Sequence, residues 1–204
     1  MTQAVIAGYA RSPFHFASKG ALARIRPDDL GADVVRGLVG KTRIDMKDIE
    51  DLLLGCAFPE GEQGLNVARL ISFIAGLPLG VGAATINRFC GSSMQAVHSA
   101  AGAIALGAGE VFICAGIESM SRVPMGASSQ GGDAFAPLAA RYPAGLANQG
   151  ISAEIIAARG KLARPELAEF AARSPTPPPS AAARGAVDTR TIPTPPPPPP
   201  QDHA

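Results

Sequence analysis

The side chain best suited to covalent chemistry is a cysteine at the start of a predicted helix. Residues 83–109 read as a short strand, a tight turn and a helix, and Cys90 lies where the turn becomes the helix. Unpaired backbone N–H groups and the helix dipole stabilise a thiolate there, and the thiolate is the nucleophilic form of cysteine. Without this context, a cysteine is more often an inert buried side chain. The small residues Gly91, Ser92 and Ser93 leave the sulfur approachable, which favours a nucleophile.

The helix after Cys90 is predicted to be buried on nearly all sides. Apolar residues recur at three- and four-residue steps, which is typical of one helix face: Met94, Val97, Ala101, Ile104 and Ala108. The other faces carry alanine and glycine, so neighbouring backbones can come close to this helix. We therefore expect a central helix that presents Cys90 to a cleft.

Residues 86–97, INRFCGSSMQAV, resemble the acyl-enzyme motif of thiolases, and the form CGSSMQAVH is most similar to 3-ketoacyl-CoA thiolases of fatty-acid breakdown. The resemblance implies an acyltransferase in which Cys90 attacks a 3-ketoacyl-CoA, holds the acyl group as a thioester and passes it to CoA. It implies acyl-CoA and CoA as partners, CoA as a substrate rather than a permanently bound cofactor, no metal, and a homodimer or homotetramer. A ketosynthase-type condensing enzyme is an alternative, but NRFCGSSMQ favours a thiolase.

The remaining cysteines and histidines do not complete a catalytic set. Cys56 and Cys114 lie in apolar runs and are predicted to be core residues. His98 follows Cys90 by eight residues, about 12 Å along a helix axis, too far for a general base. His15 falls in a predicted loop and His203 in the terminal tail. In thiolases the second half supplies a histidine, a second cysteine and an asparagine-held water, so we expect this chain to be incomplete and to turn over little or no substrate.

Alternating strands and helices must position Cys90. Apolar runs predict strands at residues 4–8, 51–57 and 110–116, with the first one central in the sheet. Helices are expected from Pro27 and from Val67, the latter ending at Gly76. This order predicts an α/β fold with a mostly parallel sheet. The resemblance implies that residues 1–117 form a thiolase N-terminal domain, with a mixed, mostly parallel sheet and a buried helix.

Residues 118–174 resemble a partial loop domain of thiolases. The segment Glu118-Ser119-Met120-Ser121, followed by Pro124 and Met125, resembles the exit from the first domain. Two short helices are predicted at residues 151–159 and 164–173, after an irregular stretch over residues 126–145. Thiolases usually carry a methionine near the acyl group where Gln149 stands, so the resemblance makes Gln149 a candidate substrate-binding residue in an altered acyl pocket.

Residues 175–204 form a third, proline-rich segment. Of the 19 prolines in the chain, 11 lie between Pro175 and Pro200. Proline lacks a backbone donor, so this segment is predicted to be an extended polyproline II tail. Such a tail is a spacer or a ligand for proline-binding grooves, and this leaves a noncatalytic, thiolase-derived interaction protein as another alternative.

The amino-acid composition bears on which partners the protein can bind and on where in the cell it is found. The formal net charge of +1, from 18 basic and 17 acidic residues, gives no footprint for nucleic acid or an anionic membrane surface. Three scattered cysteines suit neither a disulfide framework nor a zinc site. Since no apolar run has the length of a membrane span or the form of a secretory signal, we expect a soluble, cytoplasmic protein.

Overall fold

The computed structural model describes residues 3–125, 136–141, 149–173 and 191–193. The chain divides into two compact units, one made of residues 1–128 and 190–204 and the other of residues 129–189. The first unit contains the sheet and Cys90. In the second unit, the described residues form helices and no strand.

A parallel sheet is the centre of the first unit. Among the described residues it has three strands in the order β2-β1-β3: β1 (Asp51–Gly55), β2 (Gly82–Ile86) and β3 (Phe112–Gly116). Gly55 at the end of β1 pairs with Ile86 on one side and Gly116 on the other, so the three carboxyl ends lie at one edge. The predicted α/β class with a mostly parallel sheet is confirmed.

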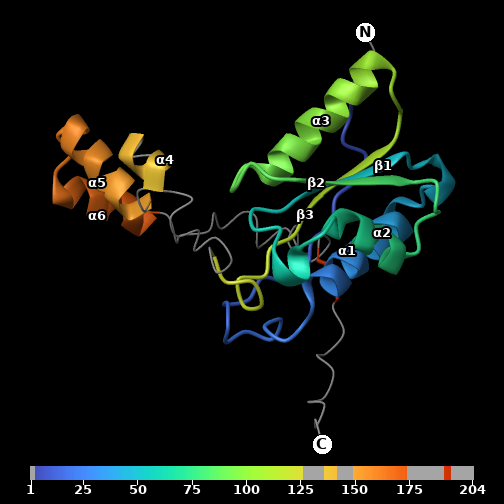
Figure 1. Ribbon diagram of the computed structural model, residues 1–204, viewed down its shortest axis with the longest axis horizontal. Coiled ribbons are helices and arrows are strands. Elements are labelled where there is room, and N and C mark those ends of the chain that lie inside the picture. The colour runs from blue at the N-terminus through green and yellow to red at the C-terminus, as the bar shows by residue number, and fades with distance from the viewer. Residues whose placement is uncertain (1–2, 126–135, 142–148, 174–190, 194–204) are drawn as a thin grey trace, which may run out of the picture. The chain divides into compact units, whose positions relative to one another are not determined.

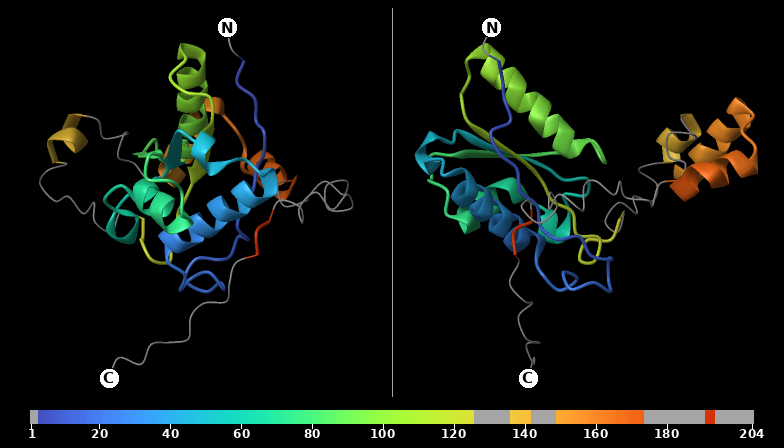
Figure 2. Two further views of the ribbon diagram at one scale, coloured as in Figure 1. Left: turned by 90° about the vertical axis from the view of Figure 1, so that its right-hand side faces the viewer. Right: turned by 180° about the vertical axis from the view of Figure 1, so that it is seen from behind.

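Helices cover both faces of this sheet (Figure 1). Helices α1 (Pro27–Thr42) and α2 (Val67–Ala75) lie on one face, and α3 (Ser92–Leu106) lies on the other. The sequence of β1 explains this arrangement, because Leu52 and Leu54 join the core under α1 and α2 while Leu53 packs with α3. Strands buried on both faces read as continuous apolar runs. The two further views in Figure 2 show the same layers.

The first two helices begin and end where the sequence indicates. Helix α1 has proline in its first turn together with the carboxylates of Asp28 and Asp29, which suit the positive end of the helix dipole. Helix α2 ends at Gly76, whose φ of 79° is the left-handed conformation that glycine adopts most easily. Two short 3₁₀ helices, η1 (Met46–Asp48) and η2 (Gly61–Gln63), complete the connections.

The predicted first strand at residues 4–8 is wrong. The structure has no strand there, and the side chains of Val5 and Ile6 are 79% and 82% exposed. The apolar run is of strand length, but no strand of the described residues pairs with it. An apolar pattern predicts a strand only where a neighbour supplies the hydrogen bonds.

The predicted burial of α3 on nearly all sides is also wrong for the described chain. Its buried residues are Ser92, Ala96 and Ala100, whereas Met94 is 62% exposed and Val97 is 42% exposed. The small residues pack against the sheet because they allow the helix to approach it closely. Met94 and Val97, two residues of the expected apolar stripe, are therefore exposed, and the small residues Ala96 and Ala100 face the sheet instead.

The second unit contains α4 (Ala136–Arg141), α5 (Gln149–Gly160) and α6 (Arg164–Arg173). Helices α5 and α6 confirm the two helices predicted over residues 151–173. Helix α4 corrects the expectation of an irregular stretch over residues 126–145, most of which lies outside the described residues. Among the described parts of the chain, no helix is long and apolar enough to cross a membrane.

One short piece of the proline-rich segment is described, and it contacts the first unit. The Ile192 N–H donates to the Arg11 carbonyl oxygen at 2.8 Å, and Thr191 forms a bridge with Arg11. The Ile192 side chain lies against Gly37 of α1. The polyproline II conformation is predicted for the runs TPPP and PPPPPP, residues 176–179 and 195–200, which lie outside the described residues.

Candidate active site

Cys90 is exposed at the start of α3, at the predicted junction of turn and helix. It is separated from Ser92, the first helical residue, by the N-cap residue Gly91. The strand β2 ends at Ile86, so only a short turn joins the carboxyl edge of the sheet to Cys90. A thiol in this position faces solvent beside the positive end of a helix.

Side-chain hydrogen bonds fix the turn before Cys90. The Phe89 N–H donates to Asn87 Oδ1 at 2.9 Å, and the Arg88 N–H donates to Ser92 Oγ at 2.8 Å. The Ser92 hydroxyl in turn donates to the Phe89 carbonyl oxygen at 2.6 Å. These bonds hold Phe89 at a φ of 47°, a left-handed conformation that costs a residue with a bulky side chain about 1–3 kcal/mol.

Two glycines let α3 sit directly on the sheet. Gly55 and Gly116 are paired neighbours at the carboxyl ends of β1 and β3. A Cβ atom on Gly55 would lie 2.3 Å from the Ser93 backbone nitrogen, and one on Gly116 would lie 2.0 Å from Ser93 Oγ. Only residues without a side chain allow this approach. The strand ends therefore determine where the first turn of α3, and with it Cys90, is placed.

The other two cysteines have environments that disfavour the thiolate. Cys56 is 1% exposed, and burial, with a smaller contribution from the negative charge of Glu118, raises its pKa to about 11. Burial also raises the pKa of Cys114, whose thiol contacts the Ala96 carbonyl oxygen beneath α3. These environments agree with the predicted core roles of Cys56 and Cys114.

The structure brings no described histidine into contact with Cys90. His15 is exposed in the loop before α1, and His98 is exposed within α3. Within the described residues, no hydrogen bond joins Cys90 to a histidine. His203 lies outside the described residues. Gln149 begins α5 in the second unit with its side chain exposed, and its role in substrate binding stays a prediction.

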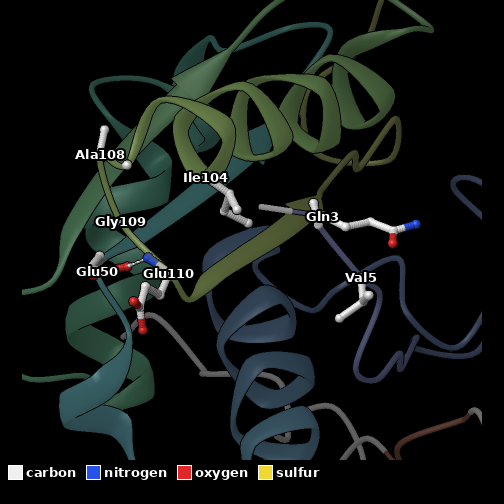
Figure 3. A pocket seen from close by; sticks show the side chains of 9 residues that line it. Gln3, Val5, Glu50, Ile104, Ala108, Gly109 and Glu110 are labelled. Atoms are coloured by element: carbon white, nitrogen blue, oxygen red, sulfur yellow. Dashed lines mark hydrogen bonds between the residues drawn. The ribbon is translucent and has the colours of Figure 1, made fainter. Parts of the chain in front are cut away.

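A hollow of about 800 Å³ lies at the other end of α3 (Figure 3). Its lining includes Gly107 and Ala108 after the helix, Val5, and the carboxylates Glu50 and Glu110. Glu50 accepts the Glu110 N–H at 2.5 Å. Helix α3 has 15 residues, about 22 Å at the standard rise, so this hollow is remote from Cys90. Within the described parts of the chain, no group of three metal-binding side chains could hold a metal ion.

Sequence reasoning missed three residues near the carboxyl edge of the sheet. Gln63 is completely buried and bonds to Glu118, and Phe58 lies against Phe89. The segment containing Glu118 was noticed only as an exit from the first domain. A glutamine in a glycine-rich loop gives no sign in the sequence that it is buried, because the burial depends on contacts between segments far apart in the chain.

An exposed cysteine at a helix start is a position in which a thiol can act as a nucleophile. Residues 4–197 match the sequence model described as the N-terminal domain of thiolase. The chain therefore belongs to the thiolase family.

Curated relatives of the chain carry the name 3-ketoacyl-CoA thiolase. The protein from Bacillus subtilis (strain 168) is 42% identical over 194 residues, covering 95% of this chain and 49% of the relative. One from Vibrio cholerae serotype O1 is 36% identical over 195 residues, covering 95% and 50%. One from Saccharophagus degradans is 39% identical over 171 residues, covering 83% and 43%. The chain thus spans about half the length of the curated relatives it matches.

Proposed function

We propose that this chain carries the nucleophilic cysteine of a thiolase that acts on 3-ketoacyl-CoA. The observation that supports the proposal most directly is the exposed position of Cys90 before α3, on a turn fixed by Asn87 and Ser92. The names of the relatives support the choice of substrate. The proposal includes acyl-CoA and CoA as partners, CoA as a substrate rather than a resident cofactor, self-association, and a cytoplasmic location.

In the proposed reaction, the Cys90 thiolate attacks the keto carbon of the substrate. The carbon–carbon bond next to that carbon breaks, and its electron pair leaves with acetyl-CoA, which then takes up a proton. The shortened acyl group stays on Cys90 as a thioester, and the thiolate of free CoA attacks it, releasing acyl-CoA and the Cys90 thiolate. The covalent intermediate divides one difficult cleavage into two easier steps.

The same turn offers a donor for the oxyanion that forms during each attack. The N–H groups of Gly91 and Ser92 donate to the carbonyl oxygens of Arg88 and Phe89. We assign the Cys90 N–H to the oxyanion, because it lies at the nucleophile itself and precedes the helix. A fixed donor aimed at developing charge is among the larger contributions to catalysis.

The proposal also holds that this chain alone completes little or no turnover. Within the described residues no histidine bonds to Cys90, so the proton transfers that both half-reactions need lack a positioned base. Both half-reactions are therefore expected to be slow. A single acylation of Cys90 accumulates during a long incubation whereas repeated turnover stays small, so the two events are expected to separate. This separation makes the two parts of the proposal testable in one preparation.

The test is to incubate the 204-residue chain with acetoacetyl-CoA and locate any acyl group by mass spectrometry of peptides. We expect acetylation at Cys90, none in Cys90→Ser, and unchanged acetylation in Cys114→Ala as the matched control. Acyl label retained in Cys90→Ser would overturn the assignment of the nucleophile. Sustained release of acetyl-CoA from acetoacetyl-CoA and CoA would overturn the proposal that the chain alone is inactive.

A further inference from the structure

A buried amide joins two loops at the carboxyl edge of the sheet. Gln63 is 0% exposed, and its Nε2 donates to the Phe58 carbonyl oxygen at 2.8 Å and to Glu118 Oε1 at 2.7 Å. Its Oε1 accepts the Ser119 N–H at 2.6 Å. A buried amide with its donors and its acceptor satisfied has one favourable orientation, so it holds its partners in fixed places.

Glu118 completes the connection between the loops. Its other carboxylate oxygen, Oε2, accepts the Ala57 N–H at 2.8 Å. The loop after β1 and the loop after β3 are therefore joined by both side chains, which we call the Gln63–Glu118 bracket. The bracket thus ties residues 57 and 58 to the end of β3.

Phe58 connects the bracket to the turn that carries Cys90. The ring centroids of Phe58 and Phe89 are 6.3 Å apart, with the planes tilted by 55°. This geometry lies within the range of favourable aromatic pairs. Phe89 directly precedes Cys90 and has the left-handed φ of 47°. The contact therefore acts on the most strained residue of the turn.

We propose that Gln63 and Glu118 are positioning residues for Cys90, acting through the contact of Phe58 with Phe89. The bracket fixes the Phe58 backbone, and the Phe58 ring keeps Phe89 in its left-handed conformation. The turn then holds Cys90 in place just before α3. Neither Gln63 nor Glu118 is assigned contact with the substrate. The inference deepens the proposed function and rests on Cys90 as the nucleophile.

The test measures alkylation of Cys90 by iodoacetamide in the full 204-residue chain, as a function of pH, with each site read by mass spectrometry. In Gln63→Leu, Glu118→Gln and Phe58→Leu, we expect the Cys90 rate at neutral pH to fall about threefold or more and the pH profile to move to higher pH. The partly buried Cys114 serves as an internal control for unfolding of the chain, and its alkylation rate should not change. An altered fold would instead raise alkylation at Cys114.

A double variant distinguishes positioning from a general loss of stability. If the bracket acts through Phe58, the rate in Gln63→Leu/Phe58→Leu falls no further than in the more affected single variant, because interacting residues are not additive. Glu110→Gln, the same change at the other end of β3, is the matched control and should leave Cys90 unaffected. Glu118→Gln changes an exposed side chain, so it tests the bracket even if Gln63→Leu does not fold.

An unchanged Cys90 profile in Glu118→Gln, or fully additive effects of Gln63→Leu and Phe58→Leu, would overturn the positioning role. The experiment requires no thiolase activity. A chain whose Cys90 is never acylated but whose alkylation profile responds to the bracket would refute the proposed function while supporting the bracket. The reverse pattern would refute the bracket alone.

Discussion

Two cysteines close to the carboxyl edge of one sheet have opposite chemical environments. Cys56 follows β1 and is buried among apolar side chains beneath the Gln63 amide, whereas Cys90 follows β2 and is exposed. Burial penalises the charged form of a thiol, so Cys56 keeps its proton at neutral pH. The difference arises from the side chains that cover each sulfur, because both residues occupy similar places after a strand.

The pKa of Cys56 predicts how stability depends on pH. Its pKa is raised from 9.0 to about 11 in the folded chain. Between these values the unfolded chain releases a proton that the folded chain keeps, so the free energy of unfolding falls as pH rises, by up to about 3 kcal/mol. Urea unfolding across this range should show a smaller fall in Cys56→Ala than in the unaltered chain. Cys90→Ala should keep the full fall, and equal slopes in all three proteins would contradict the prediction.

At the scale of elements, the contact between α3 and the strand ends leaves no room for a side chain on Gly55 or Gly116. Gly55 pairs with Gly116, and the first turn of α3 lies directly over them. A helix placed by backbone contact has little freedom to slide, because any side chain added below it meets backbone atoms. The position of Cys90 is consequently a property of β1 and β3 as much as of its own turn.

Gly55→Ala should displace the start of α3. The added Cβ would lie 2.3 Å from the Ser93 nitrogen, so we expect the free energy of unfolding to fall by about 2–4 kcal/mol. Gly102→Ala is the matched control within α3, where nothing lies within 4 Å of the new atom. It should raise the free energy of unfolding by up to about 1 kcal/mol, because alanine favours helix. Denaturant unfolding measures both, and equal effects would refute this role for Gly55.

The elements predicted correctly are those that local sequence determines. Continuous apolar runs placed β1 and β3, and proline, carboxylates and glycine placed the boundaries of α1 and α2. The errors come from contacts between elements. The run at residues 4–8 has the pattern of a strand but no described neighbour, and α3 has so many small residues that its sequence does not say which face meets the sheet.

For the candidate site, too, the sequence predicted the local features but not the contacts between segments. The motif around Cys90 predicted its place before a helix, which the structure has, and the proposed role of nucleophile. The side chains that support the turn were found only in the structure. Gln63, Phe58 and Glu118 meet because β1 and β3 are neighbours in the sheet, with the whole of α2, β2 and α3 between them in sequence. The spacing of residues within one segment of the sequence cannot predict a contact between segments so far apart in the chain.

At the scale of the whole molecule, residues near the two ends of the chain meet on the first unit. The Ile192 N–H donates to the Arg11 carbonyl oxygen, and the Ile192 side chain occupies the space that Gly37 leaves on α1. The red segment beside α1 in Figure 1 is residues 191–193. The described residues 191–193 thus belong to the same compact unit as the sheet.

Gly37→Ala should release this contact. The added Cβ would lie 2.6 Å from Ile192 Cδ1, so the side chain must leave its place and the Ile192 N–H should lose its bond to Arg11. We expect faster hydrogen exchange at the Ile192 amide. Gly40→Ala, in the same helix with nothing within 4 Å, is the matched control and should leave that exchange unchanged. Identical exchange in both variants would contradict the contact.

The order of the strands also has a consequence for synthesis of the chain on the ribosome. β1 is the central strand of the described sheet but the first of the three to be translated. Its second neighbour, β3, is translated only after both α2 and α3. Translation of these intervening residues takes several seconds at roughly 5–20 residues per second. Until then Leu52, Leu53 and Leu54 belong to a nascent strand with an open edge, a form prone to pairing with other chains. The rate of translation between residues 56 and 111 therefore sets how long this edge of the nascent strand stays open.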